Sequence, residues 1–100
     1  MKAVWKGQTI AEAPQADLIQ IEGNWYFPPS SLKPGFLRAS DTPYTCPWKG
    51  QCQYFDVGAG SDGSHDSAWS YPHPLPSSLP RVGKDFANYV AFWRDVQVQA

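Results

Sequence analysis

The chain has no long hydrophobic run, and only 17% of its 100 residues are charged. A membrane-spanning helix needs about 20 consecutive apolar residues, so we expect no membrane partner. Lys and Arg number 8 against 9 Asp and Glu, which gives a formal net charge of −1. Proteins that bind nucleic acid through its phosphates usually carry an excess of basic residues. We therefore also expect no nucleic-acid partner.

Cysteine is scarce, since only Cys46 and Cys52 occur. Six residues of extended strand would separate their sulfurs by about 20 Å, so a disulfide would require residues 47–50 to fold the chain back. These cysteines and the two histidines, His65 and His73, lack the short paired spacing of a zinc site, and we expect no metal and no cofactor. The low cysteine content, and a start without a charged and then apolar leader, predict a cytoplasmic protein.

Aromatic residues and proline are abundant: 5 Trp, 5 Tyr and 5 Phe stand beside 10 Pro and 8 Gly. That many aromatic rings can form a core, which argues against disorder. The prolines and glycines leave few stretches for a helix, and no run of ten residues has helical amphipathic periodicity. The sequence predicts a small, mainly β domain, a single unit over residues 1–100.

Two segments have the pattern of β-hairpins. Val4 to Glu12 places strand-forming residues on either side of Lys6 and Gly7, and Asp17 to Phe27 does the same around residues 22–24. The other expected elements are one helical turn within Ser30–Leu37, a turn-rich link at Ser40–Pro43, a polar hairpin loop at Gly58–Ser67, a short strand at Ala68–Tyr71, an extended segment at Pro72–Pro80, and a final strand or hairpin over Phe86–Val98 that turns at Arg94 and Asp95. His65 lies in the expected polar loop and receives no role.

One combination of short motifs resembles a known family. Its central part is Cys46-Pro47-Trp48-Lys49-Gly50, followed by Tyr54, Ala68-Trp69-Ser70-Tyr71-Pro72 and Tyr89-Val90-Ala91-Phe92-Trp93, and preceded by Tyr26-Phe27-Pro28, Leu37 and Ser40. The chain closely resembles, over nearly its whole length, the Domain of Unknown Function 427 family. These are small bacterial and fungal β proteins that are sometimes labelled nucleotidyltransferase-like.

The resemblance implies a β-tent (Mss4-like) architecture, in which two twisted antiparallel sheets meet like the sides of a tent. Zinc-binding relatives of that architecture use two pairs of cysteines, which this chain lacks. Nucleotidyl transfer requires clustered carboxylates that hold two cations, whereas the aspartates here are scattered along the sequence. The chain departs from the family at Cys52, where Ala is usual, and at Asp66, where Asn is common.

Cys46 and Lys49 are candidate catalytic residues. An ammonium group within about 6 Å of the thiol would favour the thiolate and make Cys46 a reactive nucleophile. Buried apolar filler is the alternative for Cys46, and a solvated turn residue is the alternative for Lys49.

Four aromatic residues are candidate ligand-binding residues, and Arg38 is a candidate to hold an anionic group, with an exposed pair to Asp41 or plain solvation as its alternative. Trp69 and Tyr71 alternate onto one face of their short strand, and Trp48 and Tyr54 are placed to join them. Their rings would offer stacking surfaces to a planar ligand. The alternative is that the same rings fill the core.

These observations favour a binding module that holds a small planar or anionic metabolite in an aromatic groove beside the Cys-Pro-Trp-Lys-Gly turn. One alternative is a small-molecule enzyme in which Lys49 activates Cys46. Another is a structural or protein-interaction domain. The sequence leaves the ligand and the oligomeric state open.

Overall fold

The computed structural model describes residues 1–100, and antiparallel strands dominate it. The strands are β1 (Lys2–Trp5), β2 (Gln8–Glu12), β3 (Ile19–Ile21), β4 (Asn24–Tyr26), β5 (Leu37–Cys46), β6 (Gly50–Ala59), β7 (Asp62–Ser70), β8 (Val90–Phe92) and β9 (Val96–Gln99). Helical structure is limited to two 3-10 turns, η1 (Gln15–Asp17) and η2 (Pro29–Ser31), and the five-residue helix α1 (Ser78–Val82). The prediction of a small, mainly β protein is confirmed.

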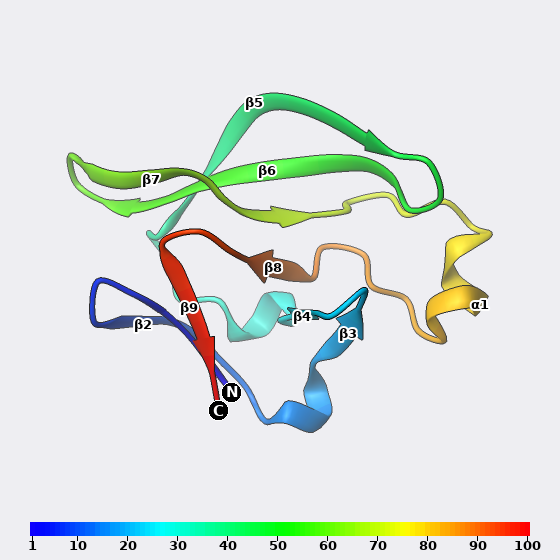
Figure 1. Ribbon diagram of the computed structural model, residues 1–100, viewed down its shortest axis with the longest axis horizontal. Helices are drawn as coiled ribbons and strands as arrows, with labels where there is room; N and C mark the ends of the chain where they lie inside the picture. The colour runs from blue at the N-terminus through cyan, green and yellow to red at the C-terminus, as the bar shows by residue number, and fades with distance from the viewer.

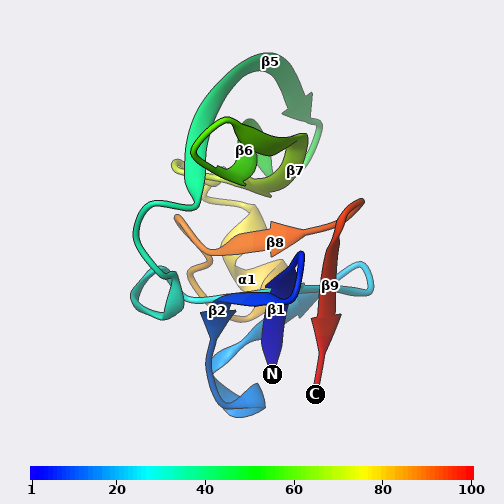
Figure 2. The same ribbon diagram turned by 90° about the vertical axis from the view of Figure 1, so that its left-hand side faces the viewer.

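The strands form three sheets (Figures 1 and 2). The largest has the order β5-β6-β7-β8, a second has the order β2-β1-β9, and β3 and β4 form a two-stranded ribbon. In Figure 1 the long strands β5, β6 and β7 form the upper layer, while the smaller sheets lie below β8. None of the helices has the length and hydrophobicity that a membrane crossing requires.

Both predicted hairpins are present, because each has a two-residue turn that suits the twist of its strands. Lys6 and Gly7 connect β1 to β2 with φ angles of 48° and 78°, and Glu22 and Gly23 connect β3 to β4 with φ angles of 53° and 83°. Two successive positive φ angles are the signature of a type I′ turn.

Two segments predicted as loops are mainly strand. Ser40–Pro43 lies inside β5, and the expected loop at Gly58–Ser67 shrinks to a turn at Gly60 and Ser61 between β6 and β7. His65 therefore lies on a strand. The polar composition of both segments was misleading: Ser40–Pro43 and residues 58–63 are exposed or half-exposed and need no apolar alternation, and the residues buried in the second segment, Ser64, Asp66 and Ser67, are themselves polar.

The C-terminal prediction was partly wrong. Strands β8 and β9 do not pair with each other, since β8 pairs with β7 and β9 pairs with β1. The expected extended segment ends in α1, whose Pro80 is tolerated because it lies in the first turn, where a helix needs no N–H donor. The expected turn at Arg94 and Asp95 is present.

The buried apolar side chains form two cores. The first core consists of Ala3, Trp5, Ile10, Ala11, Leu18, Phe27, Val57, Ala68, Val90, Phe92 and Val96. The second core consists of Ile19, Ile21, Tyr26, Cys46, Cys52, Trp69, Tyr71, Phe86 and Ala91. Strand alternation separates them, so that β8 sends Val90 and Phe92 to the first core and Ala91 to the second. Both faces of β8 are therefore buried.

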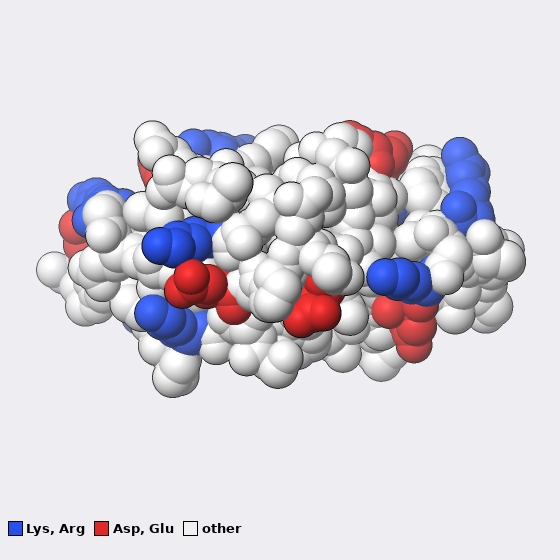
Figure 3. All heavy atoms as spheres, turned by 90° about the horizontal axis from the view of Figure 1, so that it is seen from below, with Lys and Arg blue, Asp and Glu red and all other residues white.

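Charged side chains of both signs are interspersed on the surface. Figure 3, which views the molecule from below, shows basic and acidic groups next to one another, with no extended patch of one sign on that face. This arrangement agrees with the net charge of −1.

Candidate functional site

The Cys-Pro-Trp-Lys-Gly segment is the tight turn between β5 and β6. Gly50 has a φ angle of 111°, and a Cβ atom there would lie 3.3 Å from the carbonyl oxygen of His73 and 3.4 Å from atoms of Leu75. The N–H of Leu75 donates to the carbonyl oxygen of Lys49 at 2.9 Å. Only glycine combines this backbone conformation with so close a neighbouring chain. The His73–Leu75 segment thus covers the turn, and Lys49 is only 5% exposed.

A pocket of about 260 Å³ opens beside this turn. Lys49 and Asn24 contribute its polar groups, and the remaining wall is aromatic, formed by Tyr26, Tyr44, Tyr54, Trp69, Tyr71 and Trp93. We call this cavity the aromatic pocket. Its side chains come from β4, β5, the β5–β6 turn, β6, β7 and the segments after β7 and β8, so the largest sheet and the β3-β4 ribbon must both be in place to create it.

The aromatic rings of the pocket hold one another in place. Tyr54 and Trp69 are register partners on β6 and β7, and the Trp69 indole N–H donates to the Tyr26 hydroxyl at 2.9 Å. Trp93 packs edge-on against Trp69 at 5.2 Å and nearly parallel to Tyr54 at 6.5 Å between ring centroids. Such interlocked rings form a preorganised apolar surface that can stack against a planar molecule.

Lys49 places a positive charge at this apolar wall. Its Nζ donates to a carboxylate oxygen of Glu22, which lies in the β3–β4 turn. The same nitrogen is 5.1 Å from the ring centroids of both Trp48 and Tyr71, within the range of a cation–π interaction. An ammonium group has three N–H donors, so the bond to Glu22 leaves donor capacity for a ligand.

Burial raises the pKa of three groups at or behind the aromatic pocket. It raises the pKa of Tyr26 to about 12 and that of the Cys52 thiol to about 11, although the nearby Lys49 charge acts in the opposite direction on Cys52. Burial also raises the pKa of Tyr71. At neutral pH the pocket therefore contains neutral hydroxyl groups, and its fixed charge is that of the Lys49–Glu22 pair.

The structure brings together four of the seven residues singled out from the sequence. Lys49, Tyr54, Trp69 and Tyr71 line the aromatic pocket. The other three are Trp48, Arg38 and Cys46, and none of them lines it. Trp48 lies within cation–π distance of both Lys49 and Arg81, whose guanidinium is 4.2 Å from the Trp48 ring centroid. Arg38 lines a separate hollow of about 380 Å³, and Cys46 is 5% exposed in the second core.

Sequence reasoning did not single out four lining residues: Asn24, Tyr26, Tyr44 and Trp93. Tyr44 had a usable signal, because it alternates with Cys46 along β5 and faces Cys52 across the hairpin. Trp93 had no such signal. Its position depends on the pairing of β8 with β7 and on the hydrogen bond that its backbone N–H donates to the Ser67 carbonyl oxygen at 3.0 Å.

Alkylation should distinguish a buried thiol from a reactive one. In a Cys46→Ser variant we expect iodoacetamide at pH 8 to modify native Cys52 about 100-fold more slowly than an ordinary thiol, because the two-unit rise in its pKa depletes the thiolate. In a Cys52→Ser variant, burial of Cys46 should likewise protect it until the protein is unfolded in urea. Fast native labelling of Cys46, located by peptide mass spectrometry, would contradict this expectation and favour the enzyme alternative.

Comparison with known proteins places the chain in a family. It matches, over residues 1–100, the family described as a domain of unknown function (DUF427). No curated protein matches the chain. Because the family match covers every residue, the chain belongs to the DUF427 family.

Proposed function

We propose that this protein binds a small planar molecule that carries an anionic group, with the rings stacked in the aromatic pocket and the anion on Lys49. One observation carries the proposal: a buried lysine amine and six aromatic side chains line the same cavity. A pocket with apolar walls and a few polar groups is typical of small-molecule sites.

The size of the cavity limits the ligand. At about 260 Å³ it is smaller than the roughly 300–1,000 Å³ of pockets that accept drug-sized molecules. One or two fused rings with a carboxylate fit this volume. The exposed rings of Tyr44 and Trp93 lie at the rim, where they can cover a ligand as it enters.

Lys49 supplies selectivity for the anion. A hydrogen bond to a charged group contributes about 1.5–3 kcal/mol, which corresponds to roughly 10- to 100-fold in affinity. Lys49 can bind an anion while it keeps its hydrogen bond to Glu22. The side chain of Glu22 is 55% exposed, so water solvates its charge and weakens its repulsion of a second anion.

Matched pairs of carboxylates and amides provide the test. Tryptophan fluorescence would be titrated with benzoate and benzamide, and with 2-naphthoate and 2-naphthamide. We expect each carboxylate to bind at least about 10-fold more tightly than its amide. Lys49→Met, which keeps the volume but removes the charge, should abolish that preference. Trp93→Ala should weaken binding of both members of a pair.

Trp25→Phe is the matched control, because Trp25 is half-buried against the first core and lies outside the aromatic pocket. It should alter the fluorescence signal but not the affinities. If no compound in the panel binds, or if Lys49→Met retains the preference for the carboxylate, the proposal fails. A structural or interaction role would then be favoured.

A further inference from the structure

Two irregularities in the largest sheet meet at the middle of β6. Between β5 and β6 the register changes from Ala39↔Phe55 to Pro43↔Gln53, so residues 40–42 face Tyr54 alone. Between β6 and β7 it changes from Phe55↔Ala68 to Val57↔Ser64, so residues 65–67 face Asp56 alone. Bulges of this kind redirect side chains and are frequent beside functional sites.

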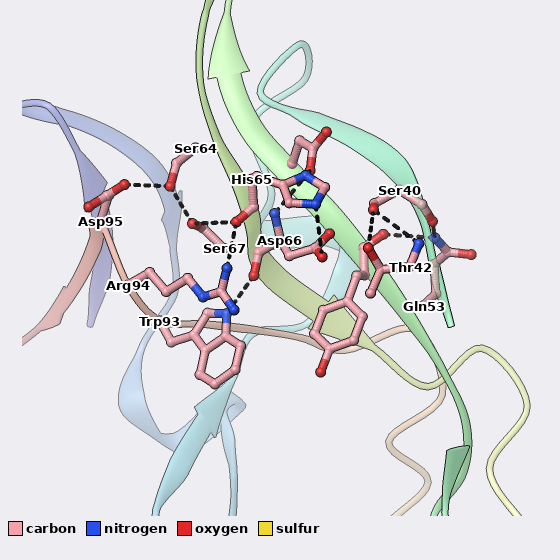
Figure 4. A network of polar contacts seen from close by, with 12 residues as sticks. Ser40, Thr42, Gln53, Ser64, His65, Asp66, Ser67, Trp93, Arg94 and Asp95 are labelled. Atoms are coloured by element: carbon pink, nitrogen blue, oxygen red, sulfur yellow. Dashed lines mark hydrogen bonds and ion pairs between the residues drawn. The ribbon is translucent and has the colours of Figure 1, made fainter. Parts of the chain in front are cut away.

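The β7 bulge gathers one imidazole and two carboxylates. The Nδ1 atom of His65 is 2.8 Å from Oδ1 of Asp56, and its Nε2 atom is 3.2 Å from Oδ2 of Asp66. Asp56 Oδ1 also accepts the backbone N–H of Asp66 at 2.9 Å. One potential ligand atom from each of the three residues lies within 4.8 Å of the others. Figure 4 shows the His65 ring facing the Asp66 side chain, with Ser40 and Thr42 nearby on β5.

One oxygen in this cluster is buried without a partner. The Asp66 side chain is only 8% exposed, and its Oδ1 atom has no hydrogen-bond partner. The hydroxyl groups of Ser40 and Thr42 lie beside this carboxylate and help to lower its pKa, and a hydrogen bond of 3.1 Å joins the two hydroxyls, but neither of them hydrogen-bonds to Oδ1. An unsatisfied buried acceptor is unfavourable and calls for a specific explanation. A cation bound by both oxygens of this carboxylate would supply the missing partner.

We propose that Asp56, His65 and Asp66 form a binding site for a divalent transition-metal ion such as Zn²⁺. His65 Nε2 and the Asp66 carboxylate are the ligands. Zinc bonds of about 2.0–2.1 Å in tetrahedral geometry place two ligand atoms about 3.3 Å apart, close to the 3.2 Å between Nε2 and Oδ2. Water completes the coordination on the open side, where the His65 side chain is 69% exposed.

Asp56 has a positioning role in this site. Its Oδ1 accepts the proton on Nδ1 of His65, which leaves the lone pair of Nε2 free for the metal. A carboxylate behind a metal-binding histidine is a common device that fixes the ring and raises its basicity. The imidazole ligand favours Zn²⁺, Ni²⁺ or Co²⁺ over Mg²⁺ and Ca²⁺, which prefer oxygen-only sites.

This site is separate from the aromatic pocket and does not depend on the function proposed for it. The two are neighbours, however, because the Trp93 indole N–H donates to the carbonyl oxygen of Asp66 at 2.5 Å. Because the metal site does not depend on the proposed ligand, it can be tested without any organic molecule.

Isothermal titration with Zn²⁺ tests the site on the full chain. We expect one equivalent to bind the parent protein. His65→Gln and Asp66→Asn should each weaken binding at least about 100-fold, and Asp56→Asn about 10- to 100-fold. Because the His65 side chain is largely exposed, His65→Gln should leave the fold intact. Asn also tolerates the φ angle of 53° at position 66.

Two controls exclude other zinc ligands. His73→Gln removes the other histidine, which is exposed, and Cys46→Ser combined with Cys52→Ser removes both thiols. Both proteins should bind Zn²⁺ like the parent. No binding up to 1 mM Zn²⁺ would overturn the proposal and leave His65 as a hydrogen-bond partner of Asp56 alone. Parent-like affinity in His65→Gln, or loss of binding in either control, would also overturn it.

Discussion

Phe27→Ala is expected to lower the free energy of unfolding by about 3–5 kcal/mol, the usual cost of truncating a buried phenylalanine. Phe27 is fully buried in the first core and packs edge-on against Phe92, with ring centroids 5.6 Å apart. Its backbone N–H and C=O both bond to Val90 on β8, at 2.7 and 2.9 Å. That pairing prevents the chain from closing inward, so a cavity should remain where the ring was.

Urea unfolding followed by circular dichroism measures this loss. Leu75→Ala is the matched control, because it also truncates a large apolar residue but at a position that is 41% exposed. It should cost less than about 1 kcal/mol. A loss of less than 1 kcal/mol for Phe27→Ala would mean that the first core can repack and that the described packing is not the source of stability.

Alkaline pH should destabilise the protein strongly between about pH 10 and pH 12. The pKa of Tyr26 is 10.0 in an ordinary environment and about 12 when buried in the folded protein. The folded state thus favours the neutral phenol, and the contribution of Tyr26 to the free energy of unfolding is complete below pH 10. It is lost as the pH rises towards 12, because only the unfolded chain ionises readily. Two pKa units correspond to roughly 3 kcal/mol.

Burial of other groups acts in the same direction. The Cys52 thiol has a raised pKa of about 11, so its contribution begins to fall near pH 9, and the pKa of Tyr71 is raised as well. The total loss should therefore exceed that of Tyr26 alone. Urea unfolding at several pH values from 8 to 12 would measure it.

Tyr26→Phe separates the contribution of Tyr26 from the others. This variant should start about 1 kcal/mol less stable, since it loses the hydrogen bond from Trp69. It should then lose roughly 3 kcal/mol less than the parent between pH 10 and pH 12. Equal losses in parent and variant would show that burial of Tyr26 does not govern the alkaline transition.

Local signals in the sequence predicted the parts of the fold that depend on neighbouring residues. Both hairpins could be predicted because each turn, Lys6-Gly7 and Glu22-Gly23, has a glycine that suits a positive φ angle and lies between two short runs of strand-forming residues. The Cys-Pro-Trp-Lys-Gly turn was likewise recognisable, and its register places Tyr54 and Lys49 at one site.

Features that depend on distant pairing could not be predicted in the same way. The C-terminal strand pairs with β1, where Lys2 faces Gln99, and no local pattern specifies that partner. The bulge around Asp66 was hidden as well, because a polar run with glycines resembles a loop whether or not it pairs. The sequence therefore left His65 without a role and Trp93 outside the site.

The burial of both faces of β8 has a consequence for how this small protein can change. Val90 and Phe92 belong to the first core and Ala91 to the second, so this three-residue strand contributes side chains to both cores. We therefore expect the two cores to loosen together, because both depend on the position of β8. A substitution deep in the first core is therefore expected to alter the shape of the aromatic pocket without contacting it.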